Sequence, residues 1–253
     1  MFLLSHLWKD LNLFTSTSMF NPNLFLRLFV IVLLGSSLSV ETGWAASNTP
    51  EQDLAKLQQV YRGLHSLRFD FTQVTRTQMR TRKGAGTAVF LRTGNNGKEG
   101  IMRWNYTDPD PQVILNDGKN LTIYTPKDHQ LLVTSAEQLN NDITYSFFSG
   151  KNNLDDDFIP QKPDSRYAFN IAGATLHTLR LIPRKPHPQI QAVRIWFDNH
   201  YLIRHLVLED PFASVTELNF SNIETNTIDS KDSKAVQAIL HLNLPPDTEI
   251  LHQ

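Results

Sequence analysis

The chain has 253 residues, of which 40% are hydrophobic, and its formal net charge is −1. This length suffices for one large domain or two small ones. The charge balance excludes a protein that binds nucleic acid through an excess of Lys and Arg. The chain contains no cysteine, which excludes disulfides, thiol nucleophiles and cysteine-ligated metal sites.

The N-terminal segment is typical of a secretory signal peptide. Arg27 precedes an apolar run over residues 28–40, and small residues follow around Ala45. The run is shorter than the roughly 20 apolar residues that a membrane-spanning helix needs. We therefore expect residues 1–45 to be cleaved off during export.

The start of the chain and its domain organisation follow from this segment. Met19 stands where signal peptides usually begin, so residues 1–18 are interpreted as the product of an over-early start codon. No internal repeat and no break in composition divides the remainder. We expect residues 46–253 to form a single, soluble, exported domain.

The mature chain begins with a predicted amphipathic helix. Thr49 is a suitable N-cap, Pro50 suits the first helical position, and Gln52 completes a capping box. Apolar residues then recur every three to four positions over residues 54–64, which indicates a helix with one buried face.

Two strands and two connections are predicted next. Residues 67–74 alternate phenylalanines with polar residues, which is typical of a strand, and residues 87–92 form another. The glycines within residues 83–86 predict a turn, and the Gly- and Asn-rich residues 93–100 predict a loop.

The segment 102–125 combines an aromatic strand with a hairpin. Met102, Trp104 and Tyr106 alternate with polar residues, so they share one face of a strand. Asp117 and Gly118 separate two further apolar runs, and Asp-Gly is a strong hairpin signal because it tolerates positive φ.

The rest of the chain is predicted to form further strands and one helical segment, residues 135–154. About ten strands and two helical segments predict an α+β fold, mainly β, built on one antiparallel sheet that is long enough to curl. The further strands are expected at residues 131–134, 167–171, 177–182, 191–197, 202–208, 214–223 and 240–244.

Acidic residues do not predict a catalytic centre. Asp108 and Asp110 alternate with prolines, and Asp is common in such turns because its side chain bonds the local backbone. Asp117 is explained by its hairpin. The acidic run 155–157 lacks the spaced ligands and the glycine of a calcium loop, so a solvated turn is the better interpretation.

Other candidate sites are equally weak. The histidines show no metal-ligand spacing, and no nucleophile elbow, phosphate-binding loop or dinucleotide motif is present. Neither a catalytic residue, a metal site nor a cofactor is predicted. Arg76, Arg80, Arg82 and Lys83 form a basic run that suits a solvated strand end, or a weak contact with anionic lipid headgroups.

The aromatic residues leave two interpretations open. Fifteen Phe, four Trp and six Tyr suffice to build an ordinary core. A curled sheet can also enclose more apolar surface than its own side chains fill. Periodicity does not distinguish a filled core from a cavity.

A family resemblance bears on this choice. The run from Met102 to Tyr124 is similar to that of the periplasmic outer-membrane lipoprotein carrier family, LolA, and the resemblance extends in order over essentially the whole mature chain. The residues that carry it are Met102-Arg103-Trp104, Tyr106, Pro109, Pro111-Gln112, Ile114, Asp117-Gly118, Leu121 and Ile123-Tyr124, with Phe69, Phe71 and Gln73 upstream and Leu242, Leu244, Pro245 and Pro246 downstream.

The resemblance implies an unclosed, curved antiparallel β-barrel with a helical lid over an apolar cavity. It also implies a monomeric, non-enzymatic periplasmic chaperone of Gram-negative bacteria that carries acylated lipoproteins between the two membranes. Its partners would be an inner-membrane ABC transporter that exports lipoproteins and an outer-membrane lipoprotein receptor.

The resemblance also implies site residues. Arg92 and Arg103 are the candidates for closing the lid, with Arg92 preferred because it ends the second strand where the family often has an arginine. The expected cavity residues are Phe69, Phe71, Phe90, Trp104, Tyr106, Leu121, Ile123 and Phe197.

Two other functions remain as alternatives. One is a periplasmic domain of the same fold that senses lipids or lipoproteins. The other is a secreted hydrolase that uses Asp108 and Asp110 as its acid pair.

Overall fold

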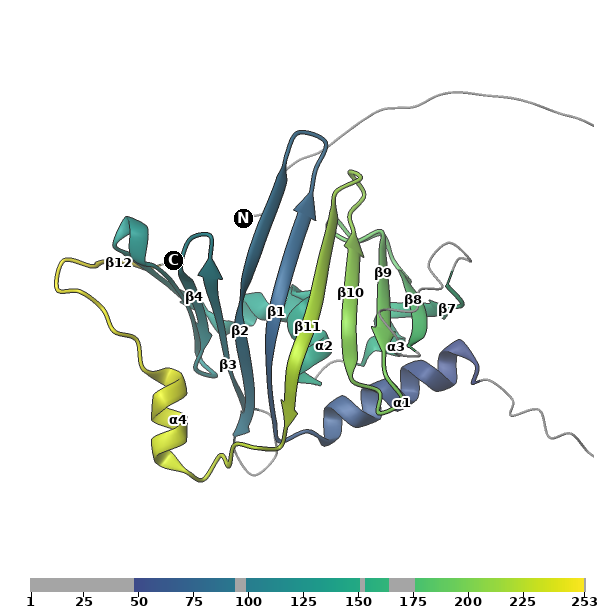
Figure 1. Ribbon diagram of the computed structural model, residues 1–253, viewed down its shortest axis with the longest axis horizontal. Helices are drawn as coiled ribbons and strands as arrows, with labels where there is room; N and C mark the ends of the chain where they lie inside the picture. Colours follow the sequence, from purple (N-terminus) through teal and green to yellow (C-terminus); the bar gives the residue numbers. More distant parts are fainter. Residues whose placement is uncertain (1–47, 94–98, 151–152, 164–175, 253) are drawn as a thin grey trace, which may run out of the picture. The chain divides into compact units, whose positions relative to one another are not determined.

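The computed structural model describes residues 48–93, 99–150, 153–163 and 176–252 (Figure 1). None of the helices in these segments is long and apolar enough to span a membrane. The predicted signal peptide, residues 1–45, lies outside the described residues. The helices are α1 (Pro50–Gly63), η1 (Pro126–Asp128), η2 (Ala136–Asn141), α2 (Ile143–Ser149), α3 (Leu154–Asp157) and α4 (Ser233–Leu240).

The described strands form one 12-stranded sheet. They are β1 (Ser66–Arg76), β2 (Thr81–Thr93), β3 (Glu99–Asp108), β4 (Gln112–Asn116), β5 (Asn120–Thr125), β6 (Gln130–Ser135), β7 (Phe158–Gln161), β8 (His177–Pro183), β9 (Ala192–Phe197), β10 (Ile203–Glu209), β11 (Val215–Thr225) and β12 (Glu249–His252). Their spatial order is β12-β6-β5-β4-β3-β2-β1-β11-β10-β9-β8-β7, so β12 and β7 are the edges and the sheet does not close. A sheet of this width curls, and the predicted fold class is confirmed.

The first helix forms as its capping residues predict. The Thr49 side chain accepts a hydrogen bond from Gln52 N, and the Gln52 side chain accepts one from Thr49 N at 2.9 Å, which completes the capping box. Leu54, Leu57 and Tyr61 are buried on one side of the helix. This stripe packs the helix onto the sheet.

The two faces of the sheet differ in what covers them. The face that carries Phe69, Phe71 and Trp104, here called the inner face, packs against α1, α2 and α3 in the larger hydrophobic core. The opposite or outer face carries Leu91 and Ile101, which pack in a smaller cluster with Ile239 of α4. Side chains alternate between the faces along each strand.

The turn predicted at residues 83–86 is wrong. This segment lies inside β2, and the chain reverses at residues 77–80, where Thr77 N donates to Arg80 O at 2.9 Å. Gly86 is needed for another reason, because a Cβ atom at this position would lie 1.8 Å from the carbonyl oxygen of Asn105 in β3. Close approach of two strands, and not a turn, requires this glycine.

The C-terminal region also differs from the prediction. Residues 240–244 are not a strand. Leu240 is the last residue of helix α4, whose N-terminus is capped by the Asp232 carboxylate, which accepts from Lys234 N at 2.9 Å. Strand β12 follows and pairs with β6 in parallel, so the sheet is not antiparallel throughout.

Several smaller differences remain. Strand β7 was not predicted, and the loop expected at residues 93–100 is shorter because Thr93 and Glu99 belong to β2 and β3. Two predicted segments lie outside the described residues: the strand at residues 167–171, and residues 94–98 at the centre of the loop predicted at 93–100. The remaining strands and the helical segment 135–154 are confirmed within a few residues at each end.

The close approach of β2 and β3 makes Gly86 a sensitive position. We expect Gly86→Ala to lower the free energy of unfolding by about 1–3 kcal/mol or more, because Asn105 O belongs to the backbone and cannot move without opening the ladder. Urea denaturation measures this change. In Gly63→Ala the new Cβ meets nothing within 4 Å, so this control should be neutral or slightly stabilising; equal losses in both variants would contradict the explanation.

Candidate functional site

The inner face encloses a cavity of about 480 Å³, here called the main cavity. Its walls come from strands β1 to β4, β10 and β11, from η2 and the start of α2, and from the connections before β9 and after β10. Its apolar lining consists of Phe90, Met102, Trp104, Tyr106, Ile114, Leu139, Tyr145, Pro188, Ile190, Leu208, Phe212 and Leu218. Ligand pockets of small molecules typically have volumes of this order.

An aromatic cluster forms the wall at β1 to β3. Phe90, Trp104 and Tyr106 line the main cavity. Phe71 stands behind them, with ring centroids 4.5 Å from Trp104 and 5.1 Å from Tyr106. Phe69 lies deeper, 5.6 Å from Trp104. All of these residues share one face because their strands are in register and their positions alternate.

The cluster continues into helix α2. Phe148 of this helix lies 4.9 Å from Phe69, 5.5 Å from Phe90 and 5.1 Å from Phe220, centroid to centroid. Phe69, Phe148 and Phe220 do not line the main cavity. Phe148 therefore fills the space between α2 and the sheet, and its removal would extend the cavity along β1 and β11.

The other expected cavity residues lie elsewhere in the fold. Leu121 is buried in the larger core, and Ile123 is half-buried. Phe197 is fully buried and stacks on Tyr201 with 5.1 Å between the ring centroids. None of these three lines the main cavity, and their contact with a ligand stays a prediction.

One end of the main cavity is polar. Tyr106 Oη donates to Gln73 Oε1 at 2.9 Å, Gln73 Nε2 donates to Thr75 Oγ1 at 3.2 Å, and the hydroxyls of Thr75 and Thr216 lie 3.1 Å apart. Burial raises the pKa of Tyr106 to about 12, so its hydroxyl stays protonated. The inner face of β1 thus changes from phenylalanines to polar side chains toward this end.

Sequence reasoning missed Asp142, Ile190, Phe212 and Leu218 at this site. The first three lie in connections, where no strand period predicts orientation. The Asp142 carboxylate accepts from Tyr145 N at 2.7 Å and caps α2. Although much of the residue is exposed, burial of the carboxyl group beside the cavity raises its pKa. For Leu218 one sequence signal was available: it lies two residues before Phe220 in β11, which predicts that both side chains share one face of the sheet.

Arg92 links the two helices that cover the inner face. Its Nη2 donates to Tyr61 O at 2.8 Å and to Ser149 O at 2.9 Å, and its Nη1 donates to Arg62 O. These carbonyls belong to the last turns of α1 and α2. Burial, and secondarily the nearby Arg62, lowers the pKa of the guanidinium below its usual value, but at neutral pH an arginine remains charged.

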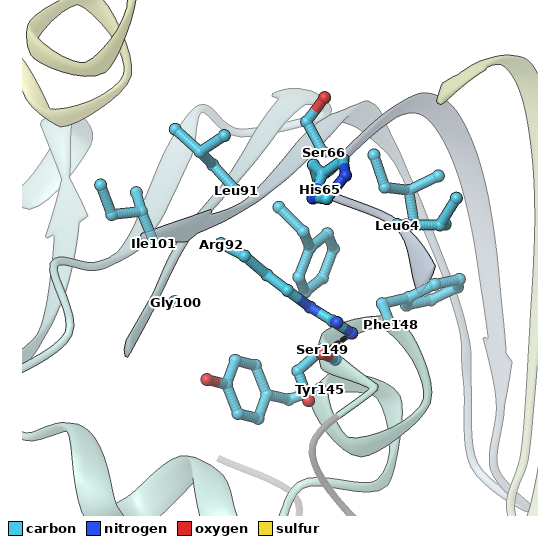
Figure 2. A pocket seen from close by; sticks show the side chains of 12 residues that line it. Leu64, His65, Ser66, Leu91, Arg92, Gly100, Ile101, Tyr145, Phe148 and Ser149 are labelled. Atoms are coloured by element: carbon cyan, nitrogen blue, oxygen red, sulfur yellow. Dashed lines mark hydrogen bonds between the residues drawn. The ribbon is translucent and has the colours of Figure 1, made fainter. Parts of the chain in front are cut away.

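Figure 2 shows this link in a smaller pocket beside the main cavity. The Arg92 side chain extends from the sheet toward Ser149, between Tyr145 and Phe148 of α2. Gly150 makes the approach possible, because it has a φ of +60° and a Cβ atom there would lie 2.3 Å from Arg92 Nη2. The guanidinium occupies the place that a side chain at this position would take.

Arg103 lies on the outer face. Its Nη1 donates to Ile239 O at 2.8 Å and to His241 O at 2.6 Å, and its Nε donates to Asn105 Oδ1 at 2.8 Å. Burial lowers its pKa as well. Arg103 therefore binds the C-terminal end of α4, and of the two candidates only Arg92 contacts α1 and α2.

The acidic residues have local structural partners. Asp117 accepts from Lys119 N at 2.8 Å and from Asn120 N at 2.7 Å; burial opposes ionisation, but these hydrogen bonds lower its pKa overall. Asp110 pairs with Lys127 at 3.2 Å on the surface. Within the described segments, no three His, Asp or Glu side chains gather to hold a metal ion.

The sequence comparisons point to one family. The family described as outer membrane lipoprotein carrier protein LolA matches residues 62–233. An outer-membrane lipoprotein carrier protein of Nitrosomonas europaea is 31% identical over 145 residues, which cover 57% of this chain and 64% of that protein, just under two thirds of its length. Another, of Dechloromonas aromatica, is 25% identical over 173 residues, 68% of this chain and 76% of that protein.

A solved structure shows the same fold. An uncharacterized conserved protein from Thermus thermophilus superposes with a TM-score of 0.50 at 9% identity, covering 80% of this chain and 98% of the other. At this level of identity the similarity concerns the fold alone.

The contacts of Arg92 predict how firmly the helices are held. We expect Arg92→Ala to lower the free energy of unfolding by roughly 2–4 kcal/mol, since hydrogen bonds from a charged donor are lost at three carbonyls. Hydrogen exchange should accelerate at the C-terminal turns of α1 and α2. Arg103→Ala is the matched control and should accelerate exchange in α4 instead; unchanged exchange in α1 and α2 of Arg92→Ala would refute the assignment.

Proposed function

Because the chain belongs to the outer membrane lipoprotein carrier family, LolA, we propose that it shelters the acyl chains of lipoproteins in the main cavity and carries them through the periplasm from the inner to the outer membrane. The observation that carries this proposal is the main cavity of about 480 Å³ with its aromatic wall, beside helix α2, which Arg92 links to α1. Members of this family are carriers and not enzymes, so no reaction is proposed.

The need for such a cavity follows from the cargo. Burying one methylene group is worth about 0.8 kcal/mol, so exposing an acyl chain of roughly 14 methylenes to water costs on the order of 11 kcal/mol. A carrier must cover that surface while the lipoprotein crosses the periplasm. The aromatic wall offers a large apolar area, and the fixed rings lose little conformational freedom on binding.

The cavity must also grow for its cargo. Phe148 of α2 packs against Phe69, Phe90 and Phe220 of the sheet. If α2 moves away from the sheet, these phenylalanines become free to contact an acyl chain. We include Phe69, Phe71, Leu121, Ile123 and Phe197 among the acyl contacts on this basis, in addition to the side chains that already line the main cavity.

Arg92 is proposed to keep the lid closed. Its hydrogen bonds to Tyr61 and Ser149 hold both helices against the sheet when no cargo is bound. Cargo that displaces Phe148 would compete with these bonds. Because cargo binding and lid closure would then be coupled, the affinity of the protein for its cargo stays moderate. Moderate affinity is what release to the next partner requires.

Two partners complete the proposed path. An inner-membrane ABC transporter that exports lipoproteins would supply the energy for loading, and an outer-membrane lipoprotein receptor would accept the cargo. The carrier itself would then need only a difference in affinity between successive partners. A cleaved signal peptide over residues 1–45 would place it in the periplasm.

A release assay tests this proposal. Protein purified from the periplasm, added to spheroplasts that display a newly acylated lipoprotein, should release the lipoprotein as a soluble one-to-one complex. If the lipoprotein stays on the membrane while an established carrier releases it, the proposed function is wrong.

Variants locate the site in the same assay. Trp104→Ala should reduce release at least about tenfold, because it removes part of the cavity wall. Trp196→Ala is the matched control: Trp196 is equally buried but alternates to the outer face, beside His205. This control and Asp117→Asn should leave release nearly unchanged, and equal losses in the two Trp variants would indicate a general effect on folding.

A further inference from the structure

The hairpin that joins β1 to β2 ends in an exposed apolar side chain. Met79 lies at its tip with 94% of its surface exposed, more than any other large hydrophobic residue in the described segments. Thr77 stabilises the turn, since its hydroxyl lies 3.1 Å from Arg80 O and 3.2 Å from Arg80 N. A single exposed hydrophobic side chain is common; its surroundings make this one informative.

The tip is surrounded by positive charge. Residues 74–85 contain four basic side chains and no Asp or Glu, although the whole chain has a net charge of −1. Arg80, Arg82 and Lys83 are exposed and form no ion pair with any described residue, whereas Arg76 pairs with Glu217. Arg82 lies opposite Thr75 and Lys83 opposite Val74, so the charges extend from both faces of the hairpin.

This hairpin borders the main cavity. Thr75 and Thr77 belong to the cavity lining, as do Pro188 and Phe212 in the connections before β9 and after β10. The antiparallel order brings these connections and the hairpin to the same end of the sheet. Figure 1 shows the hairpin extending past the neighbouring β10–β11 connection. Near the rim, the Asp210 carboxylate accepts hydrogen bonds from Phe212 N and Ser214 N.

We propose that the β1–β2 hairpin docks the protein on the anionic phospholipid surface of a membrane. Arg80, Arg82 and Lys83 would contact the headgroup phosphates, while Met79 enters the interfacial region with the mouth of the main cavity beside the bilayer. The lipid binding is independent of any cargo; its role in passing acyl chains to or from a membrane rests on the proposed carrier function.

A membrane fits this tip better than an acidic protein does. A stable protein interface buries about 800 Å² on each partner, which a four-residue turn and three separate long side chains do not present as one packed surface. A lipid surface is deformable and adapts to an isolated apolar side chain flanked by cations. Its attraction for basic side chains also falls with added salt.

Vesicle sedimentation tests the proposal with protein purified from the periplasm. Binding should be clear on vesicles of phosphatidylcholine with about 30% phosphatidylglycerol, weak on phosphatidylcholine alone, and weakened by salt. Each of Arg80→Glu, Arg82→Glu and Lys83→Glu should weaken binding by about fivefold or more. For all three hairpin changes together, the matched control is the combination Lys119→Glu, Lys231→Glu and Lys234→Glu, which changes the net charge equally at exposed sites elsewhere and should have little effect.

A fluorescent label reports the contact at the tip. The chain has no cysteine, so Met79→Cys provides a single site for an environment-sensitive dye. Its emission should shift to the blue on phosphatidylglycerol vesicles, whereas the same dye at Ser221→Cys, an exposed position near the far end of β11, should not shift.

The outcomes are distinct. Failure to bind phosphatidylglycerol vesicles, an equal effect of the control combination or an unshifted tip label would overturn the proposal. If the hairpin variants keep vesicle binding yet fail to pass on lipoprotein, the hairpin contacts an acidic protein and the lipid proposal is wrong. A failed release assay with intact vesicle binding would remove the carrier function and leave the docking surface in place.

Discussion

A wide, open sheet with one apolar face needs cover for that face, and the short helices of this chain supply it only in part. Twelve strands curl around the inner face, while α1 and α2 place their buried side chains over one region of it. The uncovered region becomes the main cavity. The same shortage of covering helices explains why Phe69 of β1 packs against Phe148 of α2, whereas Trp104 and Tyr106 of β3 border empty space.

The alternation of strand side chains decides which residue performs which task. Arg92 and Arg103 lie on neighbouring strands and both bind carbonyl groups at helix ends, yet they face opposite sides of the sheet. Arg92 holds α1 and α2 against the inner face, and Arg103 holds α4 against the outer face. A shift of one residue in either strand would move the arginine of that strand to the opposite face.

Local signals in the sequence predict local structure well here. The capping box at Thr49, the alternation at residues 102–106 and the hairpin at Asp117-Gly118 depend on neighbouring residues, and all three appear in the structure. Gly86 was misinterpreted because the atom that requires a glycine belongs to another strand.

The cavity could not be inferred from periodicity alone for a related reason. Phe69, in the core, and Trp104, on the cavity wall, share the same alternation, so only the position of α2 separates a filled region from an empty one. The family resemblance supplied that distinction for the fold. It did not identify the contributions from the connections around Ile190 and Phe212.

One guanidinium between two helix ends has a thermodynamic consequence. Tyr61 and Ser149 offer their carbonyl groups to the same nitrogen of Arg92, so α1 and α2 share this attachment to the sheet. When one carbonyl departs, the cation gains freedom and its remaining bond weakens, which couples the two openings. The openings of helices α1 and α2 should therefore be coupled through this one side chain.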